Sequence, residues 1–135
     1  MLLRLERPLA VFDLETTGTR IGRDRIVQIA IVRLLPGGER ERYQSLVNPG
    51  IPIPPEATAI HGISDRDVAT APRLDDIAGE VLGHLAGCDL AGFNAIRFDV
   101  PFLTEELFRT GHAWDTAQLR IVDAQRIFHK KEPRD

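Results

Sequence analysis

The stretch LAVFDLETTG, residues 9–18, decides the fold. Its first four residues are all apolar, which is the pattern of a strand that is buried on both faces. The apolar run stops at Asp13, and Glu15 follows two residues later. The stretch therefore predicts a buried strand that ends at Phe12 and delivers an acidic cluster to the edge of a sheet.

Two further strands follow and are predicted to pair with the first. One is an apolar run from Ile26 to Leu35, followed by the turn signal PGG at 36–38, and the other runs from Tyr43 to Val47. Tight connections between consecutive strands predict an antiparallel meander. Four prolines between Asn48 and Pro55 lack a backbone donor, so we expect an extended connection outside the sheet there.

The rest of the chain alternates helices and strands. Apolar residues recur at helical spacing over 73–86 and 98–109, and each stretch is followed by a glycine that can end a helix. Short apolar runs at 88–91 and 119–122 predict two more strands. A meander followed by helix-strand-helix-strand units is typical of an α/β domain with a mixed sheet flanked by helices. Residues 1–135 are therefore expected to form a single domain.

The composition excludes several classes of protein. The chain has 135 residues, of which 43% are hydrophobic and 27% are charged, as in ordinary globular domains. No apolar run approaches the roughly 20 residues that span a bilayer, and the single cysteine excludes an internal disulfide and a CxxC zinc site. We therefore expect a cytoplasmic protein with no membrane partner. The net charge of −3 gives no long-range attraction for phosphates, although acidic residues that hold metal ions could still bind them.

Asp13 and Glu15 are the first candidates for chemistry. Because side chains alternate along a strand, both carboxylates are expected to point to the same side. Their mutual repulsion would be relieved by a shared proton or by a hard cation with oxygen ligands, such as Mg²⁺ or Mn²⁺. The structural alternative is that Asp13 caps a turn and Glu15 points into water.

A second set of candidates lies in two short segments. The glycine of TTG at 16–18 lets backbone amides approach a phosphate or nucleotide terminus closely, or forms an ordinary turn. Asp99 lies near the expected start of a helix, where the positive end of the helix dipole favours an anion. Close to it are Asn94, whose amide can hydrogen-bond a sugar, and Phe98, whose ring suits either a base or the core.

Three motifs carry a resemblance to a known family. FDLETTG at 12–18 and GFNAIRFDVPFL at 92–103 resemble the first two motifs of the DEDD family of 3′-to-5′ exonucleases. HGIS at 61–64 resembles an element of the DEDDh branch, which includes the proofreading epsilon subunit of bacterial DNA polymerase III. The motifs stand in the family's order and the resemblance covers nearly all of the chain, so it implies a ribonuclease H-like fold.

The resemblance also implies a reaction and a set of site residues. The family uses two divalent ions, Mg²⁺ or Mn²⁺, to hydrolyse the terminal phosphodiester of DNA or RNA and release a nucleoside monophosphate. The residues that correspond to its catalytic metal ligands are Asp13, Glu15 and Asp99. The residues implied to bind the terminal nucleotide of the substrate are Thr16, Thr17, Gly18, His61, Asn94 and Phe98. The implied partners are a single-stranded DNA or RNA 3′ end and DNA polymerase subunits.

One motif of the family is missing. It is a histidine followed five residues later by an aspartate, which supplies the general base and a metal ligand. Neither His112 with Asp115 nor His129 with Asp135 has that spacing. This chain by itself is therefore expected to be nearly inactive, because proton transfer alone contributes roughly 10²- to 10⁴-fold. We expect the domain to be incomplete at its C-terminus and the enzyme to continue past Asp135.

Three other functions remain open on sequence grounds. A haloacid-dehalogenase-type phosphatase also starts with a strand and D-x-D-x-T, but it needs a downstream lysine, and the only lysines are Lys130 and Lys131. A sugar-kinase or actin-like ATPase uses D-x-G-T-T, where Glu15 would replace the glycine and repel the nucleotide. A non-catalytic module could keep the fold and bind a 3′ end or a partner protein, although an acidic cluster facing phosphates gives such a binder no advantage.

Overall fold

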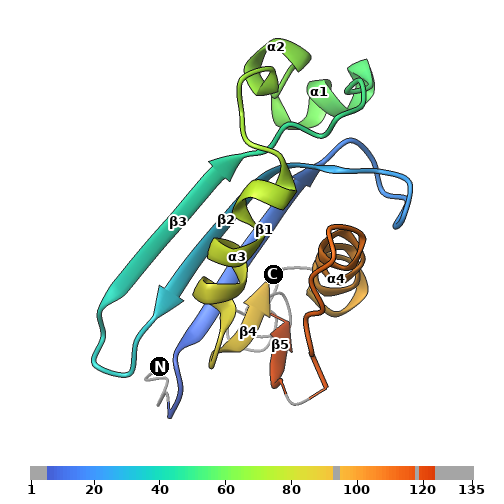
Figure 1. Cartoon of the computed structure of the whole chain (residues 1–135). Helices are drawn as coiled ribbons and strands as arrows, with labels where there is room; N and C mark the ends of the chain where they lie inside the picture. Colours follow the sequence, from blue (N-terminus) through green and yellow to red (C-terminus); the bar gives the residue numbers. More distant parts are fainter. Residues whose placement is uncertain (1–5, 93–94, 118, 124–135) are drawn as a thin grey trace, which may run out of the picture.

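A computed structural model describes residues 6–92, 95–117 and 119–123 of the chain. Its centre is a five-stranded sheet in the order β3-β2-β1-β4-β5 (Figure 1). The strands are β1 (Leu9–Thr16), β2 (Ile26–Leu34), β3 (Arg40–Leu46), β4 (Asp89–Gly92) and β5 (Ile121–Asp123). β1 pairs with β2, and β2 with β3, in antiparallel fashion, whereas β4 lies parallel to both β1 and β5. The predicted meander and mixed α/β sheet are confirmed.

The helices lie between these strands. They are α1 (Pro55–His61), α2 (Asp65–Val68), α3 (Leu74–Leu85), the π-helical turn η1 (Ala95–Asp99) and α4 (Val100–Arg109). α3 begins where the Asp76 carboxylate accepts the Arg73 backbone N–H at 3.0 Å. In Figure 1, α3 lies over the sheet and runs roughly along the strands, while α1 and α2 lie beyond the end of β3. Within the described ranges, no helix has the length and apolar character needed to cross a membrane.

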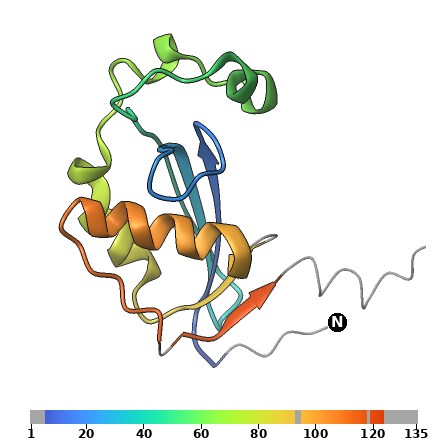
Figure 2. The same cartoon turned by 90° about the vertical axis from the view of Figure 1, so that its right-hand side faces the viewer.

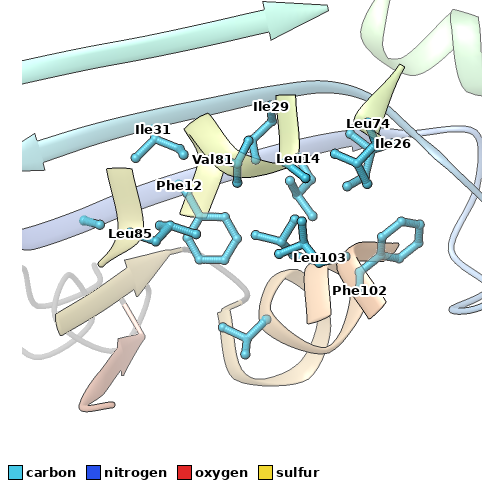
Figure 3. Close-up of a cluster of buried hydrophobic side chains, with 14 of the residues drawn as sticks. Phe12, Leu14, Ile26, Ile29, Ile31, Leu74, Val81, Leu85, Phe102 and Leu103 are labelled. Carbon is cyan, nitrogen blue, oxygen red and sulfur yellow. The ribbon is translucent and has the colours of Figure 1, made fainter. Parts of the chain in front are cut away.

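One face of the sheet carries the main hydrophobic core. Phe12 and Leu14 of β1 alternate onto this face with Ile29 and Ile31 of β2, and α3 and α4 cover them (Figure 3). Figure 2 shows α4 running across the strands rather than along them. This burial sets the register of β1 against β2, because a shift by one residue would turn Phe12 and Leu14 outward.

A smaller apolar cluster ties α1 and α2 to β2. It consists of Val27, Ile53, Ala57, Ile63 and Val68. The sequence predicted an extended connection up to Pro55 but neither of these helices. With 7 and 4 residues, they are too short to show the 3.6-residue repeat of apolar positions that indicates a helix.

Several predicted boundaries are wrong. β3 begins at Arg40, three residues before the predicted Tyr43, and β5 begins at Ile121 instead of Leu119. β1 does not end at Phe12 but continues to Thr16, because its backbone stays paired with β2 and a sheet face that is open to water accepts polar side chains. The helix predicted to begin at Phe98 is preceded by η1, which starts the helical run at Ala95. Asp99 has helical dihedrals of −63° and −46° at the junction with α4, so it lies inside this run and not at its start.

Candidate functional site

Asp13 and Glu15 lie on the side of β1 that faces away from the main core. Their neighbours in β1 alternate into the core, whereas Asp13 is exposed and Glu15 is half-buried. On β2, Ala30 stands opposite Asp13 and Gln28 stands opposite Glu15, so both cross-strand neighbours are uncharged. The prediction that the two carboxylates share one side of the strand is confirmed.

A pocket of about 320 Å³ opens where β1 ends. Its walls come from the end of β1 and the loop after it, from α1 and from η1. Six of the residues that the family resemblance implies for the site line this pocket: Glu15, Thr16, Thr17, Gly18, His61 and Phe98. The fold thus gathers segments that are far apart in the sequence around one residue of the acidic pair.

His61 joins α1 to the end of β1. Its Nδ1 accepts the Ile63 backbone N–H at 3.0 Å, and its Nε2 lies 3.1 Å from the Thr16 carbonyl oxygen. Because Nδ1 acts as an acceptor, Nε2 carries the hydrogen and donates it to Thr16. Gly62, with φ +76°, reverses the chain so that Ile63 can reach the ring. Both ring nitrogens are engaged, so His61 fixes the position of one wall of the pocket.

The threonine hydroxyls of the pocket wall form hydrogen bonds within the loop. The Thr16 hydroxyl donates to the Gly18 carbonyl at 2.6 Å. The Thr17 side chain is buried, and its hydroxyl donates to Asp24 Oδ1 at 2.9 Å. A Cβ on Gly18 would lie 2.5 Å from Asp24 Oδ2, so the close approach that this glycine allows is to a carboxylate of the protein itself.

Asp99 is the third predicted carboxylate ligand. It is buried, and η1 packs against β1, β4 and β5. Asp13, Glu15 and Asp99 all offer carboxylate oxygens, which is the donor chemistry that a hard divalent cation prefers. Among the residues that the structure describes, no three His, Cys, Asp or Glu side chains are grouped so that they could hold a metal ion. These residues therefore supply suitable ligand types without completing a metal site.

Other residues considered in the sequence are not placed at the pocket. Asn94, predicted to bind the substrate, lies outside the described residues, as do His129 and Asp135. His112 and Asp115 make hydrogen bonds within the turns that contain them. His112 and Asp115 therefore do not stand in for the missing histidine and aspartate at this pocket.

A buried carboxylate, Glu106 of α4, holds the start of β2. Its side chain is 3% exposed, and its Oε1 accepts the Ile26 backbone N–H at 3.3 Å. The guanidinium groups of Arg109 and Arg25 lie 3.1 Å and 3.7 Å from Oε2. Burial raises the pKa of Glu106, and the hydrogen bonds and positive charges around it offset part of that rise.

This raised pKa predicts a pH dependence of stability. The folded protein binds the Glu106 proton more strongly than the unfolded chain, so the contribution of this group to stability falls as pH rises from 4.5, its ordinary pKa, through the folded-state value. Glu106→Gln lacks this titration but keeps an acceptor for Ile26. We expect the unfolding free energy of the wild type, relative to Glu106→Gln, to fall as pH rises above 4.5 in urea titrations. A difference that grows with pH would contradict this.

Residues 10–130 match the model of the RNase T family, which is described as exonuclease. The chain belongs to this exonuclease family. The exonuclease domain is 42% identical over 115 residues to the DNA polymerase III subunit epsilon-like protein of Rhodobacter capsulatus. The aligned region covers 83% of the chain and 16% of that relative. It is 36% identical over 96 residues to the DNA polymerase III subunit epsilon of Treponema pallidum. This second aligned region covers 71% of the chain and 44% of that relative.

The fold of the exonuclease domain is shared with exonuclease I. The structure of E. coli exonuclease I in complex with a dT13 oligonucleotide matches with a TM-score of 0.81, over 95% of this chain and 31% of that chain, at 20% identity. The ribonuclease H-like fold and the resemblance to DEDDh exonucleases are thereby confirmed. The chain spans less than half the length of each of these three proteins.

The contribution of α1 to the pocket of the exonuclease domain was not predicted from the sequence. Glu56 and Ile60 line the pocket beside His61, and Ile60 is 85% exposed. These residues were not recognised because α1 itself was not predicted. Its boundaries carry signals that could have located it, since Pro55 occupies the first helical position and Gly62 ends the helix.

Proposed function

We propose that this exonuclease domain hydrolyses the terminal phosphodiester at the 3′ end of a nucleic acid and releases a nucleoside monophosphate. The observation that carries the proposal is the pocket at the end of β1, where Glu15, His61 and Phe98 meet. Carboxylates beside a partly apolar pocket suit a ligand with a phosphate at one end, held through metal ions, and a base at the other.

The pocket has two kinds of wall that match the two ends of a nucleotide. Leu14, Ile60 and Phe98 are apolar and suit a base, whereas the Glu15 carboxylate marks the polar side. A volume of about 320 Å³ is at the small end of ligand pockets, which favours a single nucleotide over a longer segment. In the proposed complex the base packs against Phe98 and Ile60, and the terminal phosphate lies toward Asp13 and Glu15.

Divalent cations are part of the proposal. Asp13, Glu15 and Asp99 would hold two Mg²⁺ or Mn²⁺ ions together with ligands from other parts of the protein. Such ions, when bound, stabilise the charge on the phosphate and make water easier to deprotonate at neutral pH. Glu15 lines the pocket and shares a side of β1 with Asp13, so it would connect the nucleotide with the metal ligands. We propose that the general base and a further ligand follow Asp135 in the protein.

Single-stranded DNA is the proposed first substrate, with RNA as the second. The structural neighbour exonuclease I has been solved with a dT13 oligonucleotide. Two relatives carry the name of the epsilon subunit of DNA polymerase III or of a protein like it, which supports polymerase subunits as proposed partners.

The test is the degradation of a 5′-labelled single-stranded oligonucleotide with Mn²⁺, by residues 1–135 and by a longer chain that continues past Asp135. We expect the longer chain to produce a ladder that shortens from the 3′ end, and residues 1–135 to produce almost none. EDTA should abolish the ladder, because chelation removes the ions. A 3′-labelled oligonucleotide is the control: an exonuclease releases its label as a mononucleotide in the first step, whereas an endonuclease releases longer labelled fragments.

The opposite result would support the non-catalytic alternative. If the longer chain cuts neither DNA nor RNA, the proposed exonuclease activity is wrong. An increase in Tm on adding Mn²⁺, without cleavage, would then indicate a module that binds a metal ion in its folded state and does not use it for hydrolysis.

A further inference from the structure

The loop between β1 and β2 is folded around one carboxylate, Asp24. In Figure 1 this is the blue loop that leaves the end of β1. Asp24 Oδ1 accepts the Thr17 hydroxyl at 2.9 Å, and Oδ2 accepts the Arg20 backbone N–H at 2.8 Å. The same carboxylate packs against the backbone of Gly18, where a Cβ would lie 2.5 to 2.8 Å from its three atoms. One side chain therefore contacts three positions of the loop.

Thr17 completes the closure of this loop. Its backbone N–H donates to the Arg25 carbonyl at 2.8 Å, and its hydroxyl accepts the Arg25 backbone N–H at 3.0 Å. With 3% of its surface exposed, Thr17 has little contact with water, so these hydrogen bonds are costly to break. The two ends of the loop are thus held together by Thr17, and Thr17 is itself held by Asp24.

The closed loop is also tied to the rest of the domain. The Arg25 guanidinium lies 3.7 Å from the buried Glu106 carboxylate of α4. On the other side, the Thr16 carbonyl receives the hydrogen bond from His61 of α1. The segment Thr16–Gly18, which forms one wall of the nucleotide pocket, is therefore fixed from two directions.

We propose that Asp24 is a positioning residue for nucleotide binding. It does not line the pocket, but it holds Thr17 and Gly18, which do. A wall that is already ordered loses less conformational freedom when a nucleotide binds, so Asp24 acts on affinity for the 3′ end and not on the hydrolytic step. This inference rests on the proposed exonuclease function and adds to it a residue outside the three family motifs.

Two substitutions separate the contributions of this carboxylate. Asp24→Asn keeps one oxygen, but its amide NH₂ cannot accept a hydrogen bond, so either Arg20 or Thr17 loses its acceptor. Thr17→Val preserves the shape of the side chain and removes the hydroxyl that joins Asp24 to Arg25. Because both changes act on the same network, their effects should not add.

The experiment measures KM and kcat for a single-stranded DNA oligonucleotide with the full chain that carries the activity. We expect Asp24→Asn to raise KM about tenfold with kcat changed by less than about threefold, because one or two hydrogen bonds that order the wall are lost. Thr17→Val should raise KM by a similar factor, and the double variant should exceed the larger single effect by less than about threefold.

The matched control is Asp76→Asn. Asp76 also accepts a backbone N–H, from Arg73 at 3.0 Å, but it caps α3 and does not line the nucleotide pocket. A purely structural role would lower Tm in both variants and leave KM at the wild-type value in both. We expect KM to rise in Asp24→Asn alone.

The possible failures are distinguishable. A wild-type full chain that does not shorten DNA or RNA overturns the exonuclease function and this inference with it. An active wild type with an unchanged KM in Asp24→Asn overturns the positioning role alone. Equal effects of Asp24→Asn on kcat and on KM would also overturn it, because the carboxylate would then act beyond nucleotide binding.

Discussion

Asp13→Ala, in a longer chain that shortens oligonucleotides, is expected to reduce kcat roughly 10²- to 10⁴-fold. A metal ion contributes several kcal/mol of transition-state stabilisation, and each ~1.4 kcal/mol corresponds to a factor of ten in rate. Asp13 is exposed on an open face of β1, so its removal takes no packing from the core. The loss of activity should therefore occur without a loss of stability, and the rate of 3′ shortening with Mn²⁺ measures it.

Two controls make this prediction specific. Glu39→Ala removes an exposed acidic residue from the turn between β2 and β3 and should leave the rate within about twofold of the parent. A thermal unfolding curve of Asp13→Ala should superpose on that of the parent, since exposed substitutions change stability by less than about 0.5 kcal/mol. If Asp13→Ala retains more than about a tenth of the parent rate, Asp13 is not an essential metal ligand.

Glu106→Ala is expected to lower the free energy of unfolding by about 3 kcal/mol, because removing one partner of a buried ion pair leaves the remaining charge and donor uncompensated. The substitution deprives the Ile26 N–H of its acceptor and removes the anion beside Arg25, whose side chain is 20% exposed and keeps its hydrogen bonds to the Gly22 and Asp24 carbonyls. Arg109 is 41% exposed and can rehydrate, which places the expected loss at the lower end for buried pairs.

The stability of Glu106→Ala can be followed by urea denaturation. The chain has one tryptophan, Trp114. Its ring packs edge-to-face against Phe12 of the core, with the two ring centroids 6.2 Å apart, so its fluorescence reports unfolding. The matched control is Glu105→Ala, the neighbouring acidic residue on the same helix, which should change the unfolding free energy by less than about 0.5 kcal/mol. A loss below about 1 kcal/mol in Glu106→Ala would show that water replaces the buried carboxylate at little cost.

The features that the sequence by itself determined are local in the chain. Apolar runs and helical repeats predicted β1, β2, α3 and α4 because a strand or helix that covers a core shows its own period. The same alternation placed Asp13 and Glu15 on one side of β1, which the structure confirms. The motif order predicted the family, which the match over residues 10–130 confirms. The roles of the individual site residues stay predictions.

The features that only the tertiary structure decided depend on contacts between distant residues. α1 begins at Pro55, and Ala57 joins it to the apolar cluster that contains Val27 of β2. No local repeat in the sequence reveals this packing. His61 meets Thr16 across 45 positions, and Glu106 meets Ile26 across 80. A hydrogen bond or a buried charge is specified by two partners and by the fold that brings them together, whereas a sequence pattern reports one side of each contact. The acidic residues Asp13 and Glu15 could therefore be predicted from the sequence, whereas the ordered pocket wall at Thr16–Gly18 could not.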